Sequence, residues 1–156
     1  MEYKDIKIFR EYRLKFYLNA RHYVIFDNRQ SDTHPHTWEF ALTILIRRKE
    51  FIEFNIFEKK ITEFLKDYQD KVLNEISPFM VILPTLENIV DAFTPEFAEM
   101  IREVGGELLC VEGSEGPSRS YIMDLREQNA SMDSVGEKSE HILSEIIDTI
   151  LDDIMQ

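Results

Sequence analysis

One run of alternating apolar side chains constrains the fold of this chain more than any other feature. Every second residue of the run is large and apolar: Trp38, Phe40, Leu42, Ile44 and Ile46. A strand places every second side chain on one face of its sheet, whereas a helix would spread these residues around its surface. An earlier run, from Tyr12 to Phe26, also alternates. We therefore expect two strands, paired antiparallel across the polar stretch 27–33.

The apolar spacing then changes to that of helices. From about Ile56 to Tyr68, apolar residues recur at three and four positions, as one face of a helix requires. A second helix is expected to begin after Thr85 as its N-cap and to run to about Val104. Because Pro95 lies inside it, we expect a kink or a break near Thr94.

Two more strands are expected after Gly105-Gly106, over 107–112 and 118–123. The order of elements is then ββααββ, which indicates an α+β domain with an antiparallel sheet and two helices on one face. We expect this domain to span residues 1–124. Residues 125–156 are expected to form an acidic linker and a C-terminal amphipathic helix.

The apolar residues of this tail recur at helical spacing: Ile142, Leu143, Ile146, Ile147, Ile150, Leu151 and Ile154. Burying a large aliphatic side chain contributes about 1.5–3 kcal/mol, so we expect the stripe to pack on another surface. That surface belongs either to the same or a neighbouring subunit, or to a separate protein partner.

Composition excludes several classes of protein. The net charge of -12 disfavours nucleic acid and anionic membranes as partners. Cys110 is the single cysteine of the sequence, so no intramolecular disulfide forms. No stretch reaches the roughly 18–20 apolar residues of a membrane-spanning helix, and the N-terminus lacks a secretory signal. We therefore expect a single cytoplasmic domain.

Three histidines form the candidate metal site. His34 and His36 are two residues apart on the approach to a strand, so both imidazoles can face one point. His22, near the end of the preceding strand, can lie opposite them. Three imidazoles suit zinc and leave a fourth position open, as in catalytic zinc sites. An isolated His-x-His pair on an exposed strand end is the alternative interpretation.

In these residues the chain resembles the 6-pyruvoyl-tetrahydropterin synthase and 6-carboxy-tetrahydropterin synthase family. The matching residues occur in the family's order between about residues 12 and 124: Phe16, Ala20 and His22; His34-Pro35-His36, where the family usually has His-Gly-His; Glu53-Phe54; Leu73-Asn74; Pro84-Thr85-Leu86-Glu87-Asn88; and Val111-Glu112.

The resemblance implies a tunnelling fold (T-fold), in which subunits associate around a barrel into trimers and often into hexameric dimers of trimers. The resemblance also implies zinc held by His22, His34 and His36, and a pterin or purine-like ligand at a subunit interface. Glu112 would anchor the ring through paired hydrogen bonds, because a carboxylate accepts from two adjacent N–H donors. Thr85 is the second residue assigned to substrate binding.

The chain departs from the family at its proton-handling positions. Gln30 stands where the family has its catalytic cysteine, and an amide has no acid–base chemistry near neutral pH. Gln69 and Asp70 stand where the family has an Asp-His pair. Cys110 lies in an expected core strand, where a cysteine behaves as a small hydrophobe.

Two functional hypotheses remain open from the sequence. The first is a divergent zinc-dependent carbon–oxygen lyase acting on a reduced pterin, with Asp70 as the leading catalytic base and Asp32 or Asp27 as the others. The second is a non-catalytic pterin- or nucleotide-binding sensor or oligomeric scaffold. A third possibility, a vestigial site with empty histidines, ranks lowest.

Overall fold

The computed structural model describes residues 10–46, 53–127, 146–152 and 154. The chain divides into two compact units, Met1–Asp124 and Leu125–Gln156.

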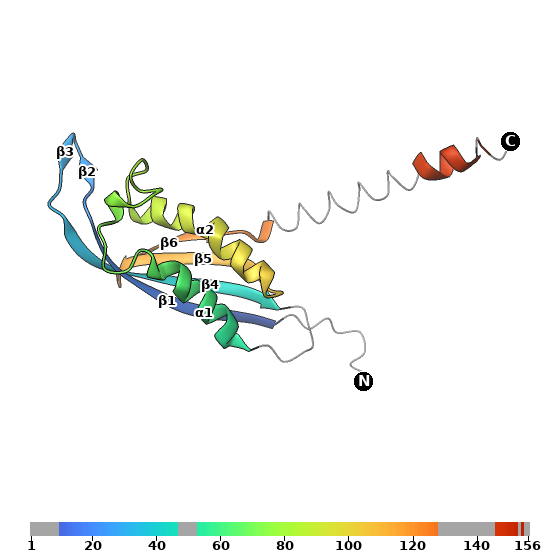
Figure 1. Ribbon diagram of the computed structural model, residues 1–156, viewed down its shortest axis with the longest axis horizontal. Coiled ribbons are helices and arrows are strands. Elements are labelled where there is room, and N and C mark those ends of the chain that lie inside the picture. Colours follow the sequence, from blue (N-terminus) through green and yellow to red (C-terminus); the bar gives the residue numbers. More distant parts are fainter. Residues whose placement is uncertain (1–9, 47–52, 128–145, 153, 155–156) are drawn as a thin grey trace. The chain divides into compact units, whose positions relative to one another are not determined.

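The first unit is built on a four-stranded sheet in the order β1-β4-β5-β6 (Figure 1). The strands are β1 (Arg10–His22), β4 (His34–Ile46), β5 (Glu107–Gly116) and β6 (Arg119–Asp124), and every neighbouring pair is antiparallel. β1 and β4 pair over their whole length, from Arg10 opposite Ile46 to His22 opposite His34. The expected antiparallel ββααββ arrangement is confirmed.

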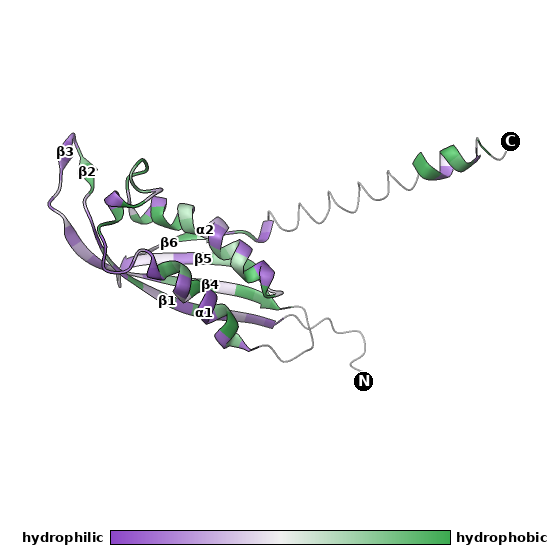
Figure 2. Cartoon of the chain, in the orientation of Figure 1, coloured by the Kyte–Doolittle hydropathy of each residue, from purple (hydrophilic) through white to green (hydrophobic). Residues whose placement is uncertain are grey.

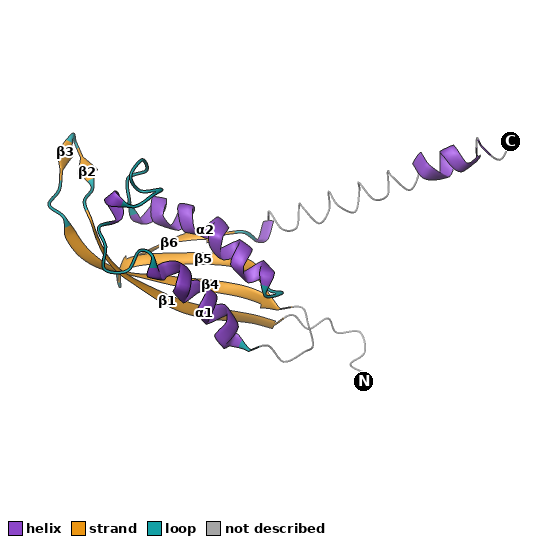
Figure 3. Cartoon of the chain, viewed as in Figure 1, coloured by secondary structure: helices purple, strands orange, loops and turns teal. Residues whose placement is uncertain are grey.

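Two helices, α1 (Phe54–Lys66) and α2 (Leu86–Glu103), cover one face of this sheet (Figures 1 and 3). A short 3₁₀ turn, η2 (Leu73–Glu75), lies in the connection between them. The alternating face of β4 forms the core with buried residues of both helices: Trp38, Phe40, Leu42 and Ile44 from β4, Phe57, Ile61 and Leu65 from α1, and Ile89, Phe93, Phe97 and Ile101 from α2.

α2 runs without a break through Pro95, so the break expected near Thr94 is absent. A proline inside a helix removes one backbone hydrogen bond and costs about 3 kcal/mol. Phe93 and Phe97, on either side of Pro95, are almost fully buried against Phe40 in an aromatic cluster. Burial of these rings holds the helix together across the proline.

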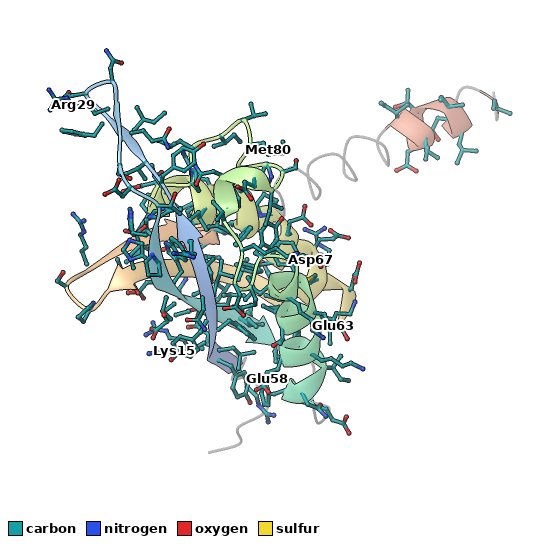
Figure 4. The ribbon with its side chains drawn as sticks, turned by 60° about the vertical axis from the view of Figure 1, so that its left-hand side comes forward. Lys15, Arg29, Glu58, Glu63, Asp67 and Met80 are labelled. Carbon is teal, nitrogen blue, oxygen red and sulfur yellow. The ribbon has the colours of Figure 1, made fainter. Side chains whose placement is uncertain are left out.

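A small ribbon occupies the end of the first expected strand and the start of the polar stretch 27–33. β2 (Ile25–Phe26) and β3 (Arg29–Gln30) pair around a two-residue turn at Asp27 and Asn28. Both turn residues have positive φ, 49° and 59°, as a type I′ hairpin requires. The first long strand therefore ends at His22 and does not continue to Phe26. Figure 4 shows Arg29 at the tip of this ribbon.

Side-chain amides close part of the outer edge of β1. Gln69 Nε2–H donates to the Tyr17 carbonyl at 2.8 Å, and Gln69 Oε1 accepts from the Asn19 N–H at 2.9 Å. Asn74 pairs in the same way with both backbone groups of Tyr23. These two amides imitate the backbone of a neighbouring strand and fix the end of β1 that carries His22.

The second unit contains a helix over residues 146–152, with Ile154 also helical, so the expected C-terminal amphipathic helix is present. Its large apolar side chains are between 51% and 74% exposed, and Figure 2 shows the segment as largely hydrophobic. Ile142, Leu143 and most of the expected linker lie outside the described residues. Within the described part of the chain, no helix is long and apolar enough to cross a membrane.

Candidate functional site

The register of β1 and β4 brings three histidines together at one end of the sheet. His22 is paired directly with His34, and His36 is paired with Ala20, two residues along the same face. The ring centroids of the three imidazoles lie 4.6 to 5.0 Å apart. One nitrogen of each ring lies within 4.8 Å of those of the other two. The three side chains therefore converge on a single point.

Backbone carbonyls orient two of the rings. His22 Nδ1–H donates to the Pro84 carbonyl at 2.6 Å, and His34 Nδ1–H donates to the Asp32 carbonyl at 2.8 Å. A carbonyl oxygen only accepts, so each ring carries its proton on Nδ1. Each Nε2 then presents a lone pair toward the other two histidines.

The two Nε2 atoms of His22 and His34 are 3.0 Å apart. With both Nδ1 atoms protonated, neither Nε2 of the neutral rings has a hydrogen to share, so their lone pairs face each other. A cation between them would turn this repulsion into two favourable bonds. Tetrahedral zinc with bonds of about 2.0–2.1 Å separates its nitrogen ligands by about 3.3 Å. The residues present therefore fit a metal ion.

Burial prepares His22 for this role. Its side chain is only 2% exposed, and burial lowers the pKa of its imidazole, while the hydrogen bond to Pro84 opposes that shift. The positive charge that protonation would place on His34 or His36 lowers the pKa of His22 further, and the nearby Glu115 raises it. A neutral imidazole is the form that ligates a metal.

Trp38 connects the histidines to a carboxylate. Its buried ring stands edge-on to His22 and His36, at centroid distances of 5.0 and 5.3 Å. Its Nε1–H donates to Glu115 Oε1 at 3.0 Å. The indole therefore forms a wall of the histidine site and fixes Glu115 beside it.

A cavity of about 280 Å³ adjoins the three histidines. Its lining is rich in polar and charged side chains: His22, Val24, His34, His36, Thr85, Leu86, Glu87, Glu115, Arg119, Ser120 and Tyr121. Tyr121 Oη–H donates to Asp91 at 2.8 Å, and this bond raises the pKa of the Tyr121 hydroxyl. Typical small-molecule sites have volumes of about 300–1,000 Å³, so this cavity lies just below that range.

The start of α2 serves both the helix and the site. Thr85 Oγ1 accepts from the Asn88 N–H at 3.2 Å and so caps the helix. The Asn88 side chain donates to the Leu83 carbonyl at 2.9 Å and secures the turn. This turn holds the Pro84 carbonyl against His22 and places Thr85 in the cavity wall.

The other residues that sequence analysis assigned to the site do not line the histidine cavity. Glu112 is paired with Ala41 and sits between Val111 and Gly113, which face α2, so Glu112 points to the opposite face of the sheet. Asp70 lines a separate cavity, which His36 also borders.

The remaining candidate bases, Asp27 and Asp32, also lie outside the histidine cavity. Asp27 lines a third cavity, at the β2–β3 ribbon, together with Gln30, which stands at the family's cysteine position. Asp32 contributes its carbonyl oxygen to His34.

Glu115, Arg119 and Tyr121 line the histidine cavity, and sequence reasoning missed them. A signal for Glu115 was present in the alternation of β5. Val111 is fully buried against the helices, and alternate residues share a face, so position 115 belongs to the histidine face and position 112 does not. Arg119 and Tyr121 reach the cavity from β6, and no motif marks them.

Comparison with known proteins agrees with this fold. No curated protein matches the chain. Among solved structures, the 6-pyruvoyl tetrahydropterin synthase of Caenorhabditis elegans is 12% identical, with a TM-score of 0.63, and the match covers 75% of this chain and 96% of that one.

Two further solved structures agree. The 6-pyruvoyl tetrahydropterin synthase of Plasmodium falciparum is 14% identical, with a TM-score of 0.55 and coverages of 74% and 96%. An uncharacterized protein of Wolinella succinogenes is 13% identical, with a TM-score of 0.57 and coverages of 75% and 98%.

These likenesses establish the fold, and the family follows from the sequence. A sequence profile of the family described as 6-pyruvoyl tetrahydropterin synthase matches residues 11–127, well over half of the chain. The match contains the sheet, both helices and all three histidines. The chain belongs to the 6-pyruvoyl tetrahydropterin synthase family.

Proposed function

We propose that this chain holds a zinc ion on His22, His34 and His36, binds a reduced pterin in the adjoining cavity, and acts on it as a divergent carbon–oxygen lyase. One observation carries the proposal: the Nε2 atoms of His22 and His34 are 3.0 Å apart, with their lone pairs facing each other. Each ring is held in this orientation by a backbone carbonyl that accepts from its Nδ1–H.

The donor set favours zinc among the transition metals. Neutral imidazoles suit zinc, and three protein ligands leave one position for water or substrate. Membership of the family also supports zinc as the metal. Zinc bound there would polarise an oxygen of the substrate. The chain supplies the orientation, because the carbonyls of Pro84 and Asp32 set the tautomer of two ligands.

Glu115 is the carboxylate that we assign to the ring. It lies in the same cavity as the histidines and Thr85, whereas Glu112 faces the other side of the sheet. A carboxylate has about four lone-pair positions, and Trp38 uses one of them. The remaining positions can accept from two adjacent N–H groups of an amino-pyrimidine edge, which is a strong and directional pair.

Proton transfer then requires another titratable group. Glu87 lies in the same cavity, and Asp70 lines the neighbouring cavity that His36 also borders. One solved 6-pyruvoyltetrahydropterin synthase of this fold, from Plasmodium vivax, is a variant in which a catalytic glutamate is replaced by alanine. A carboxylate can act as a general base, and we keep Asp70 and add Glu87 as the candidates.

We propose that the site is completed in a homo-oligomer based on a trimer. The cavity of about 280 Å³ is small for a ligand site within one chain, and a neighbouring subunit would enclose it further. The single Cys110 fits a reducing compartment, so we place the protein in the cytoplasm, with no nucleic-acid or membrane partner proposed.

One observation favours a non-catalytic role as the second candidate. Gln69, at a position where the family has a proton-handling residue, uses its amide to close the edge of β1. Gln30, at the cysteine position, lines a different cavity from the histidines. A site that keeps its metal ligands and has a carboxylate, Glu115, in its cavity, but lacks these groups, would serve as a pterin or nucleotide sensor, or as an oligomeric scaffold.

Metal analysis tests the proposal first. We expect about one zinc per chain in the freshly purified, untagged protein and none in the His34→Ala/His36→Ala variant, because one imidazole does not hold the ion. The His141→Ala variant changes the fourth histidine of the sequence and serves as the control, with full zinc content expected. Zinc-free wild-type protein would contradict the proposal.

Ligand binding then distinguishes the role of Glu115 from that of Glu112. By calorimetry with a reduced pterin, Glu115→Gln should weaken binding about tenfold or more, because a charge-assisted pair is lost. Glu112→Gln is the matched control and should bind as wild type does. Turnover of the bound pterin would identify a lyase, and binding without turnover would favour the sensor.

A further inference from the structure

The C-terminal helix carries an apolar stripe that lacks a covering surface within the described part of its own unit. Its members are large and more than half exposed: Ile146, Ile147, Ile150, Leu151 and Ile154. Contiguous apolar surface of this kind marks an interaction site. The function proposed above uses none of these residues.

The composition of this helix favours burial of its apolar stripe. Four of the seven residues from 146 to 152 are β-branched, and β-branched side chains lower helix propensity. Asp152, toward the C-terminal end, is unfavourable for the helix dipole. A helix with these residues gains its stability from burial of the apolar stripe.

The spacing of the stripe is that of a coiled-coil seam. Ile147, Ile150 and Ile154 follow one another at three and four residues, which are the a, d and a positions of a heptad. Ile146 and Leu151 flank this seam at g and e. The acids Asp148 and Asp152 then fall at b and f, on the outer surface, and Asp153 takes the g position in sequence.

We propose that this C-terminal helix associates with the same helix of other copies of this chain in a parallel bundle. Isoleucine at both a and d favours three or four strands over two. Charges at e and g set partner choice. Here Ile146 at g and Leu151 at e are apolar, and Asp153 is the one charge at these positions between residues 146 and 154. Identical copies would place Asp148 and Asp152 away from the seam, and only Asp153, at g, would bring like charges near its edge.

The chain between the two described parts is long enough for these helices to meet. Eighteen residues, 128–145, separate them and span at most about 60 Å when fully extended. Within an oligomer of the first unit, such tethers raise the local concentration of the helices. The inference does not depend on the zinc site or on pterin binding.

Cross-linking of the full-length chain tests the seam. Two variants are compared in a Cys110→Ser background: Ile150→Cys, which places a thiol in the seam, and Thr149→Cys, which places it at the outer c position. A short thiol-specific cross-linker should join Ile150→Cys chains into dimers and trimers on a denaturing gel, and Thr149→Cys chains far less. Equal cross-linking of both variants, or none in Ile150→Cys, would overturn the proposal.

A second substitution tests whether the apolar stripe causes the proximity. Adding Ile147→Asp to the Ile150→Cys chain should lower the cross-linked fraction more than about tenfold, because it places a carboxylate in the seam. Adding Thr149→Asp introduces the same charge on the outer surface and should leave that fraction unchanged. Cross-linking that survives Ile147→Asp would assign the proximity to the first unit and reject the bundle.

Discussion

Backbone carbonyls, not side chains, hold the imidazoles of His22 and His34 in their orientation. The acceptors belong to Pro84 and Asp32, 62 and two residues away in sequence. A substitution at either acceptor residue keeps its carbonyl, so the ring orientation depends on the path of the backbone. The turn before α2 and the turn before β4 are therefore parts of the metal site.

The buried position of His22 leads to a pH dependence in the metal-free protein. Burial lowers the pKa of His22 below its ordinary value of 6.5, so the folded chain resists a proton that the unfolded chain accepts. Stability is then fully present above pH 6.5 and declines as the pH falls below it. We expect the urea midpoint of chelator-treated protein to decrease as the pH is lowered from about 7 to about 5.

The His22→Gln variant supplies the comparison for this pH dependence. It removes the titrating group, so its urea midpoint should change less over the same range. An equal decline in the variant would show that other groups cause the pH dependence, and it would remove the evidence that His22 stays neutral in the folded chain.

The residues of the site differ in how far sequence could place them. The i, i+2 spacing of His34 and His36 fixes their common face, and the antiparallel pairing of two long strands then brings His22 opposite. Glu115 needed one more step, because its face follows from the buried Val111 four residues earlier. The cavity itself depends on β6 and on the turn before α2, and these contacts leave no periodic signal in the sequence.

At the scale of elements, the packing of α2 on β5 depends on a glycine. A Cβ added to Gly113 would lie 2.3 Å from Val90 Cγ2, closer than two carbon atoms can approach. Val90 is fully buried and β-branched, so its methyl group has little freedom to move. We expect Gly113→Ala to lower the free energy of unfolding by about 1–3 kcal/mol in urea titrations.

Gly116, in the same strand, provides the matched control. A Cβ added there meets no atom within 4 Å, so Gly116→Ala should change stability by less than about 0.5 kcal/mol. Should Gly113→Ala prove as stable as Gly116→Ala, the close approach of α2 to β5 would be wrong.

The long elements follow from periodicity, and the short ones do not. The two long strands, β1 and β4, and α1 repeat their apolar residues over a dozen positions, which sets their type. The β2–β3 ribbon has strands of two residues, too short for any period, and only the positive φ of Asp27 and Asn28 marks it. The break expected at Pro95 is absent, because burial of the flanking aromatic rings stabilises the helix there.

At the scale of the whole molecule, the histidine cavity and the exposed apolar helix belong to different units. Every residue that lines the histidine cavity belongs to Met1–Asp124, as do all three histidines. The exposed apolar helix belongs to Leu125–Gln156. We propose that the first unit carries the site and that the second acts on assembly.

Truncation after Glu127 tests this division, because it removes the apolar helix and leaves the residues that the family profile matches. We expect the truncated chain to keep the zinc content and pterin affinity of the full chain. Its mass in sedimentation velocity should fall at low protein concentration, because the tethered helices no longer add to the subunit contacts. Loss of zinc from the truncated chain would instead show that the tail supports the metal site, and the two units would then have to be treated as one.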